Sequence, residues 1–139
     1  MALTFKFFTD VGLTAPVSAP ILASQNDAGT TPAIETQLWF GSATAGVKAQ
    51  ALSDPGVDQI TISVTDATPG ASHLPTEIKL ALTQGGLAAA TPGAALDLGV
   101  TVTSAVPVEF WAQIDDATLL VSTETDLGLT TNTLKETAV

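Results

Sequence analysis

Apolar and polar side chains alternate with a period of two in several short segments of this chain, most strictly from Ile60 to Asp66. In an extended strand this alternation places Ile60, Ile62 and Val64 on one face and the intervening threonine and serine side chains on the other. A strand with one apolar and one polar face is typical of half-buried antiparallel sheet. The pattern therefore predicts β structure in this segment.

The same alternation, or a short apolar run, predicts further strands along the chain. Turn-forming residues separate them, most clearly at Asp54-Pro55-Gly56. Two prolines restrict one of the segments to an edge strand or a bent strand, and only Leu87–Ala90 indicates a turn of helix. The expected strands are Leu3–Phe8, Val17–Ser24, Ile34–Phe40, Val47–Leu52, Ile60–Asp66, Glu77–Thr83, Leu98–Val102, Val106–Ile114 and Thr118–Thr125.

About eight short strands with little helix are typical of all-β domains built from two packed sheets. We expect residues 1–139 to form a single antiparallel β-sandwich, jelly-roll or Ig-like, with a small barrel as the alternative. A chain of this length buries enough surface to fold as one domain. Met1–Ala2 and Leu134–Val139 lie outside the strong strand patterns, so we expect terminal arms that become ordered only against neighbouring subunits.

The charge of the chain excludes several classes of partner. Fourteen acidic residues face four lysines and no arginine, which gives a formal net charge of −10. Binding to nucleic acid or to anionic lipid requires clustered cations, so we expect neither partner. No apolar stretch approaches the roughly 20 residues that span a bilayer. A basic protein surface is the easier partner for such an acidic chain.

Few side chains are arranged for catalysis or metal binding. Asp54 and Asp58, and the pair Asp115-Asp116, offer carboxylates to calcium, but their spacing does not match an EF-hand and turn-forming aspartates explain them equally well. The single histidine, His73, has neither a second histidine nor a cysteine to complete a zinc site or a catalytic pair. Paired carboxylates can form in space without a motif. We nevertheless expect no enzymatic activity and no cofactor.

Both tryptophans of the chain stand on the polar side of their strands. Trp39 is in phase with Gln37, and Trp111 is in phase with Glu109. A large aromatic side chain on a polar face suits a protein interface or a platform on which a sugar stacks. If a loop or a second sheet covers that face, the same side chains are ordinary core. The candidate interface residues, including two from the expected C-terminal arm, are Trp39, Trp111, Leu134 and Lys135.

Short phrases along most of the chain carry a family resemblance. They are Leu38–Ser42, Ser53–Ile60, Glu77–Ala81, Ala90–Gly93 and Val106–Trp111. These phrases resemble small virion structural proteins of tailed bacteriophages. Among such proteins, a cysteine-free β-sandwich rich in threonine and alanine is most similar to a head decoration (cement) protein.

The resemblance implies a non-enzymatic protein that binds the major capsid protein on the outer surface of the capsid and stabilises the shell. It also implies a homotrimer, made in the host cytoplasm and located on the virion. Two alternatives remain open at this point. One is a structural component of a phage tail or baseplate, and the other is a carbohydrate-binding module with Trp39 or Trp111 as its stacking platform.

Overall fold

The computed structural model describes residues 3–17, 23–24, 34–66, 74–114, 123–124 and 127–139. It confirms an all-β fold in which antiparallel sheets pack in a sandwich-like arrangement. The expected strands Val17–Ser24 and Thr118–Thr125 lie largely outside the described residues. His73, Asp115 and Asp116 lie outside them altogether.

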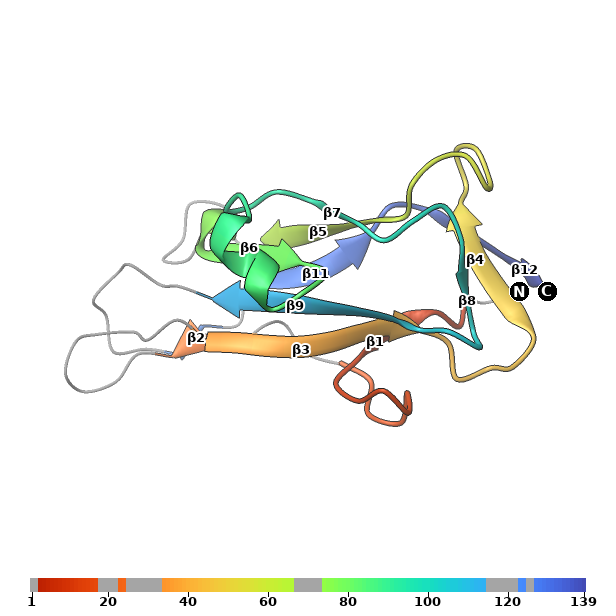
Figure 1. Cartoon of the computed structure of the whole chain (residues 1–139), viewed down its shortest axis with the longest axis horizontal. Coiled ribbons are helices and arrows are strands. Elements are labelled where there is room, and N and C mark those ends of the chain that lie inside the picture. The colour runs from red at the N-terminus through yellow and green to blue at the C-terminus, as the bar shows by residue number, and fades with distance from the viewer. Residues whose placement is uncertain (1–2, 18–22, 25–33, 67–73, 115–122, 125–126) are drawn as a thin grey trace.

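The largest sheet has four strands in the order β1-β3-β9-β6. In Figure 1, β3 and β9 run along the long axis of the molecule, while β4 stands across this axis at one end. Two three-stranded sheets, β11-β5-β7 and β12-β4-β8, and a short pair, β10-β2, complete the fold. The strands are β1 (Lys6–Phe8), β2 (Ala23–Ser24), β3 (Ile34–Gly41), β4 (Val47–Ala51), β5 (Thr61–Asp66), β6 (Ile78–Ala81), β7 (Leu96–Asp97), β8 (Val102–Thr103), β9 (Val108–Ile114), β10 (Thr123–Glu124), β11 (Leu127–Thr131) and β12 (Leu134–Ala138).

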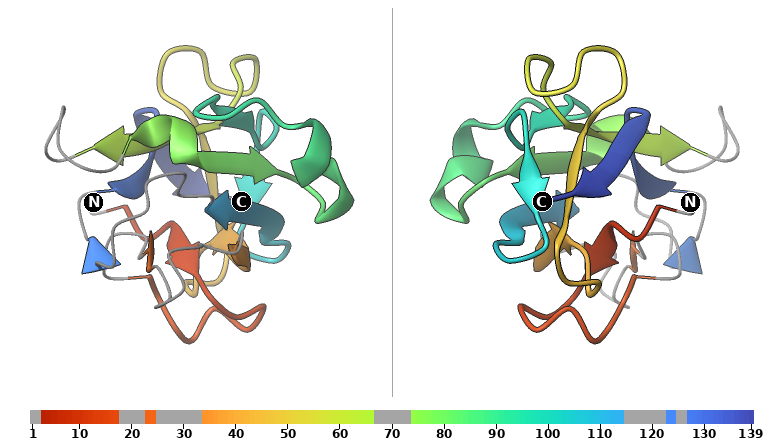
Figure 2. Two further views of the ribbon diagram at one scale, coloured as in Figure 1. Left: turned by 90° about the vertical axis from the view of Figure 1, so that its left-hand side faces the viewer. Right: turned by 90° about the vertical axis from the view of Figure 1, so that its right-hand side faces the viewer.

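Among the described residues, helical structure is confined to two short 3-10 turns, η1 (Pro75–Glu77) and η2 (Gly85–Ala89). The second of these occupies nearly the segment where the sequence indicates a helical turn. In the end views of Figure 2 the strands surround a common interior and η2 lies at the outside. The buried Leu87 fixes η2 against β6 and β9.

The pairing of β3 with β9 determines which side chains enter the core. Their register runs from Ile34 opposite Ile114 to Phe40 opposite Val108. Leu38 and Phe110 face each other on the inner side and are both buried. The alternate residues of the two strands are thereby directed to the outer side of the sheet.

An aromatic cluster joins β1 to this pair. The ring of Phe40 lies 5.7 Å from that of Phe5 and 5.5 Å from that of Phe7, and Phe7 meets Phe110 edge-on at 5.8 Å. Such tilted and edge-on contacts are the favoured geometries for aromatic pairs. The other sheets close the core with the buried side chains Ala49, Ile60, Ile62, Leu98 and Val102.

The segment Leu98–Val102, expected as one strand, is instead the connection between two sheets, and only Val102 of it belongs to a strand. β7 ends at Asp97 and pairs with β5, whereas β8 begins at Val102 and pairs with β4. Gly99 lies between them with φ of 105°, a conformation that side-chain-bearing residues rarely adopt. The glycine lets the chain leave one sheet and join the next, which the apolar alternation alone does not reveal.

The expectation of a C-terminal arm is wrong. Leu134–Ala138 forms strand β12, which pairs with β4 along its whole length. Leu134 packs against the core, and Glu136 accepts hydrogen bonds from the backbone N–H (2.7 Å) and hydroxyl (3.0 Å) of Thr4. The pattern was missed because a glutamate occupies an inward position of the strand. Its polar partner comes from the other end of the chain, so nothing near it in sequence indicates the match.

We predict that Leu134→Ala lowers the free energy of unfolding by about 1–3 kcal/mol, somewhat less than for a fully buried leucine. Leu82→Ala is the matched control, since Leu82 is 48% exposed, and its effect should be much smaller. Denaturant unfolding of both variants measures the difference. Equal, small effects would show that the C-terminal segment does not pack on the core.

Gly41, at the end of β3, marks a close approach that only glycine permits. A Cβ added there would lie 2.9 Å from Cβ of Pro107 and 3.0 Å from Cδ1 of Leu13. We predict that Gly41→Ala destabilises the fold by about 1–3 kcal/mol. Gly85→Ala, where an added Cβ meets nothing within 4 Å, should change stability by less than about 1 kcal/mol. Thermal unfolding of the two variants distinguishes them, and similar melting temperatures would contradict the packing at Gly41.

Candidate functional site

The outer side of the four-stranded sheet brings the two tryptophans together. Trp39 lies opposite Glu109 in the register of β3 and β9, and Gln37 lies opposite Trp111. The tryptophans are therefore diagonal neighbours on one face, close enough for large side chains to interact. Both are half-buried. We call Gln37, Trp39, Glu109 and Trp111 the tryptophan face.

Hydrogen bonds hold the centre of the tryptophan face. One carboxylate oxygen of Glu109, Oε1, accepts from Nε2 of Gln37 at 2.7 Å and from the indole Nε1 of Trp111 at 3.0 Å. These bonds orient the Trp111 ring along its own strand. The indole N–H of Trp39 has no hydrogen-bond partner among the described residues.

A second carboxylate is held in a similar way next to the tryptophan face. Glu35 accepts from Nε2 of Gln84 at 2.6 Å and from Nε2 of Gln113 at 3.4 Å. Lys79 lies on the same side of the sheet, opposite Gln113 on β6, but makes no ion pair with any described residue. All the hydrogen bonds that the described residues give to these two carboxylates thus come from neutral donors.

Buried apolar side chains flank the tryptophan face on both sides, toward β1 and toward β6. Toward β1, Phe8 lies opposite Trp39 and is buried, because the segment 9–17 folds back over it. Toward β6, Ala81 lies opposite Trp111 and is buried, and η2, with its buried Leu87, contacts this strand. Phe8, Ala81 and Leu87 do not belong to the main core cluster. The tryptophans therefore lie between two smaller groups of buried side chains, one toward β1 and one toward β6.

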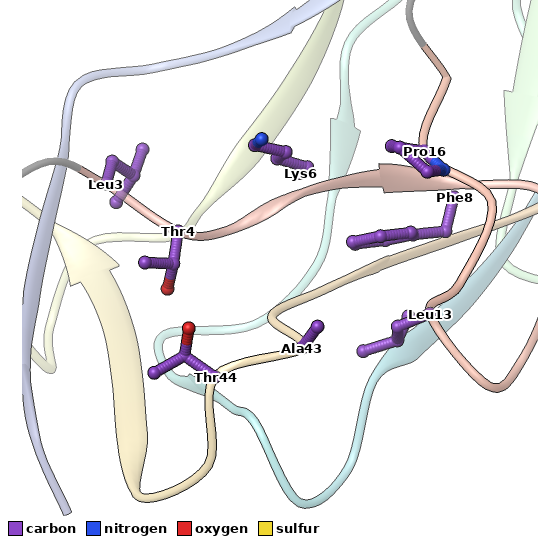
Figure 3. Close-up of a pocket in the computed structure, with 8 residues that line it drawn as sticks. All are labelled: Leu3, Thr4, Lys6, Phe8, Leu13, Pro16, Ala43 and Thr44. Atoms are coloured by element: carbon purple, nitrogen blue, oxygen red, sulfur yellow. The ribbon is translucent and has the colours of Figure 1, made fainter.

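A groove of about 490 Å³ adjoins this surface on the β1 side. Figure 3 shows Thr4 and Thr44 facing each other at one end and Phe8 and Leu13 approaching each other at the other. The polar groups along the groove are two threonine hydroxyls and one lysine, which do not form an acid–base pair. Its lining residues are Leu3, Thr4, Lys6, Phe8, Leu13, Pro16, Ala43 and Thr44.

Asp10 fixes the conformation of the turn that contains Leu13, one of the residues that line the groove. Its carboxylate accepts from the backbone N–H of Ala15 (2.8 Å) and from the backbone N–H (3.0 Å) and hydroxyl (2.8 Å) of Thr14. These bonds, that from Ala15 first, lower the pKa of Asp10 below its usual value. They also hold Leu13 at φ of 56°, a left-handed conformation that costs free energy in a leucine.

We predict that Asp10→Asn destabilises the fold at neutral pH and that the difference from the wild type shrinks in acid. A pKa that is lower in the folded state stabilises the protein above the unfolded-state pKa, and this contribution is lost as the pH falls through the folded-state pKa. Denaturant unfolding across acidic pH measures the effect. A difference between variant and wild type that stays constant with pH would contradict the role of the Asp10 carboxylate.

The structure separates the four candidate interface residues into two places. Trp39 and Trp111 share one face, whereas Leu134 and Lys135 belong to β12 in another sheet, with Leu134 directed to the core and Lys135 exposed. Their role in an interface remains a prediction. The burial of Phe8 does not follow from alternation, which puts Phe7 and Phe8 on opposite faces of the strand and gives no sign of a turn that covers Phe8.

The turn aspartates Asp54 and Asp58 are exposed, and the backbone oxygen of Asp54 accepts from the N–H of Val57 as in a simple turn. Among the described residues, no three histidine, cysteine or acidic side chains gather as a metal-binding group. The part of the chain that the structure describes also contains no helix long and apolar enough to cross a membrane. Comparison with protein-family models, with curated proteins and with solved structures finds no match to this chain.

Proposed function

We propose that this chain is a non-enzymatic virion structural protein that binds the outer surface of a phage capsid and stabilises the shell. The observation that carries the proposal is the tryptophan face, where two half-buried indoles and a hydrogen-bonded carboxylate occupy the outer side of a stiff sheet. Tryptophan is among the residues that contribute most to binding energy at protein interfaces. The proposed partner at this face is the major capsid protein.

The rigidity of the tryptophan face supports a docking role. Its side chains project from neighbouring β-strands, and the Glu109 carboxylate already restrains Gln37 and Trp111. Side chains that are ordered before binding lose less entropy when they dock. A protein that must hold capsid subunits together against internal pressure gains affinity from such pre-organisation.

The proposal includes a homotrimer located on the capsid surface and made in the host cytoplasm. The formal charge of −10 favours separation of particles whose outward surfaces are acidic. The exposed Lys135 and its neighbours on the outer side of β12 offer a further contact surface between copies. A closed ring buries such heterologous surfaces completely, whereas an open arrangement would continue into a filament.

We predict that Trp39→Ala and Trp111→Ala each weaken binding to capsids stripped of this protein by about 2 kcal/mol or more, the loss expected for a central interface residue. Because both side chains are half-buried, unfolding of the isolated variants should change less than that of Phe110→Ala, a fully buried neighbour on β9 whose loss costs about 3–5 kcal/mol.

Leu52→Ala serves as the control for binding, since Leu52 is exposed and lies outside the four-stranded sheet. It should bind stripped capsids as the wild type does. Wild-type binding by both tryptophan variants would remove the tryptophan face from the interface. Unfolding of both variants as severe as that of Phe110→Ala would assign the tryptophans to the core instead.

A further inference from the structure

We infer that Trp39, Glu109 and Trp111 form a site for an arginine side chain of the partner protein. This inference rests on the proposed function, in which the tryptophan face meets another protein, and it names the chemistry that the partner must present. The partner surface is basic and places a guanidinium group over Glu109, between the two indole rings. We call these three residues the arginine site.

The arrangement around Glu109 carries the inference. Trp39 lies directly across the strand pair from Glu109, and Trp111 lies two residues farther along the same strand and on the same face. Oε1 of Glu109 accepts both internal hydrogen bonds, and its other oxygen, Oε2, accepts none from the described residues. A free carboxylate oxygen thus lies beside two aromatic rings.

The charge at this place has no counter-ion among the residues that the structure describes. The chain has no arginine, and none of its lysines makes an ion pair with a described residue. The lysines on this side of the sheet, Lys6 and Lys79, lie on the edge strands β1 and β6, and neither is in register with Glu109. Glu109 is exposed and has no counter-ion among the described residues, so its carboxylate is complementary to a cation brought by a partner.

The aromatic rings favour arginine over lysine. A guanidinium group is planar, stacks on an indole ring and donates hydrogen bonds to a carboxylate in a fixed geometry, whereas an ammonium group is compact and more strongly hydrated. Cations bind best to tryptophan among the aromatic side chains. Glu109 and the two indoles provide both kinds of contact at one place.

Glu35 is a weaker candidate for the same task. Both of its oxygens already accept hydrogen bonds, Oε2 from Gln84 and Oε1 from Gln113. Lys79 also lies next to Gln113 in the register of the sheet. The free oxygen and the flanking tryptophans distinguish Glu109.

The composition of the chain provides a direct readout of this site. Both tryptophans belong to it and the chain has no tyrosine, so intrinsic indole fluorescence reports on the arginine site alone. Titration of the full chain with an oligo-arginine peptide at low ionic strength should change this fluorescence saturably. An oligo-lysine peptide of equal length should bind more weakly, and added salt should weaken both.

Glu109→Gln tests the carboxylate, since a glutamine retains an oxygen that can accept from Gln37 and Trp111. It should reduce affinity for oligo-arginine about tenfold, which corresponds to ~1.4 kcal/mol. Asp97→Asn removes the same charge from the exposed side of β7, in another sheet, and should leave the affinity within about twofold of wild type. If both variants lost the same affinity for oligo-arginine, the effect would come from net charge alone, and the arginine site would be overturned.

Two further outcomes separate this inference from the proposed function. If Glu109→Gln binds stripped capsids as tightly as wild type while Trp39→Ala does not, the interface stands and the arginine site is overturned. If oligo-arginine binds with the expected Glu109 dependence but no capsid binding occurs, the site stands and the proposed function falls. Saturable, salt-independent binding of a neutral oligosaccharide, without binding of the peptide, would instead identify a sugar platform and overturn the inference.

Discussion

The register between β3 and β9 is the constraint on which the rest of the structure depends. It places Leu38 and Phe110 opposite each other in the core and, by the two-residue period of a strand, Trp39 and Glu109 opposite each other on the outside. A slip of one residue would bury the glutamate and expose the phenylalanine. The same packing energy that stabilises the sandwich therefore also assembles the tryptophan face.

Alternation of side chains was sufficient to predict much of this sheet. The strands around Ile34–Gly41, Thr61–Asp66, Ile78–Ala81 and Val108–Ile114 follow from it, and so does the shared face of each tryptophan with its polar neighbours. What alternation does not supply is the pairing between strands. The sequence showed that Trp39 and Trp111 stand on polar faces, but only the register shows that they are diagonal neighbours around Glu109.

The errors have physical causes that the alternation of side chains does not report. β12 was not predicted because Glu136 occupies an inward position of the strand. Its carboxylate accepts hydrogen bonds from Thr4, at the opposite end of the chain. The expected strand Leu98–Val102 is instead a connection that turns at Gly99, and the burial of Phe8 depends on a turn held by Asp10. The first case depends on a partner far away in the sequence, and the other two depend on local backbone geometry that alternation does not report.

We propose that the tryptophan face is the surface by which this protein meets its partner on a virion. A reconstruction of the whole particle tests it most directly, because it locates the chain and shows which face is covered. We expect density for the chain on the outside of the capsid, as a trimer, with Trp39 and Trp111 against the capsid protein. Density in the tail, or a capsid-bound chain whose tryptophans face solvent, would contradict the account.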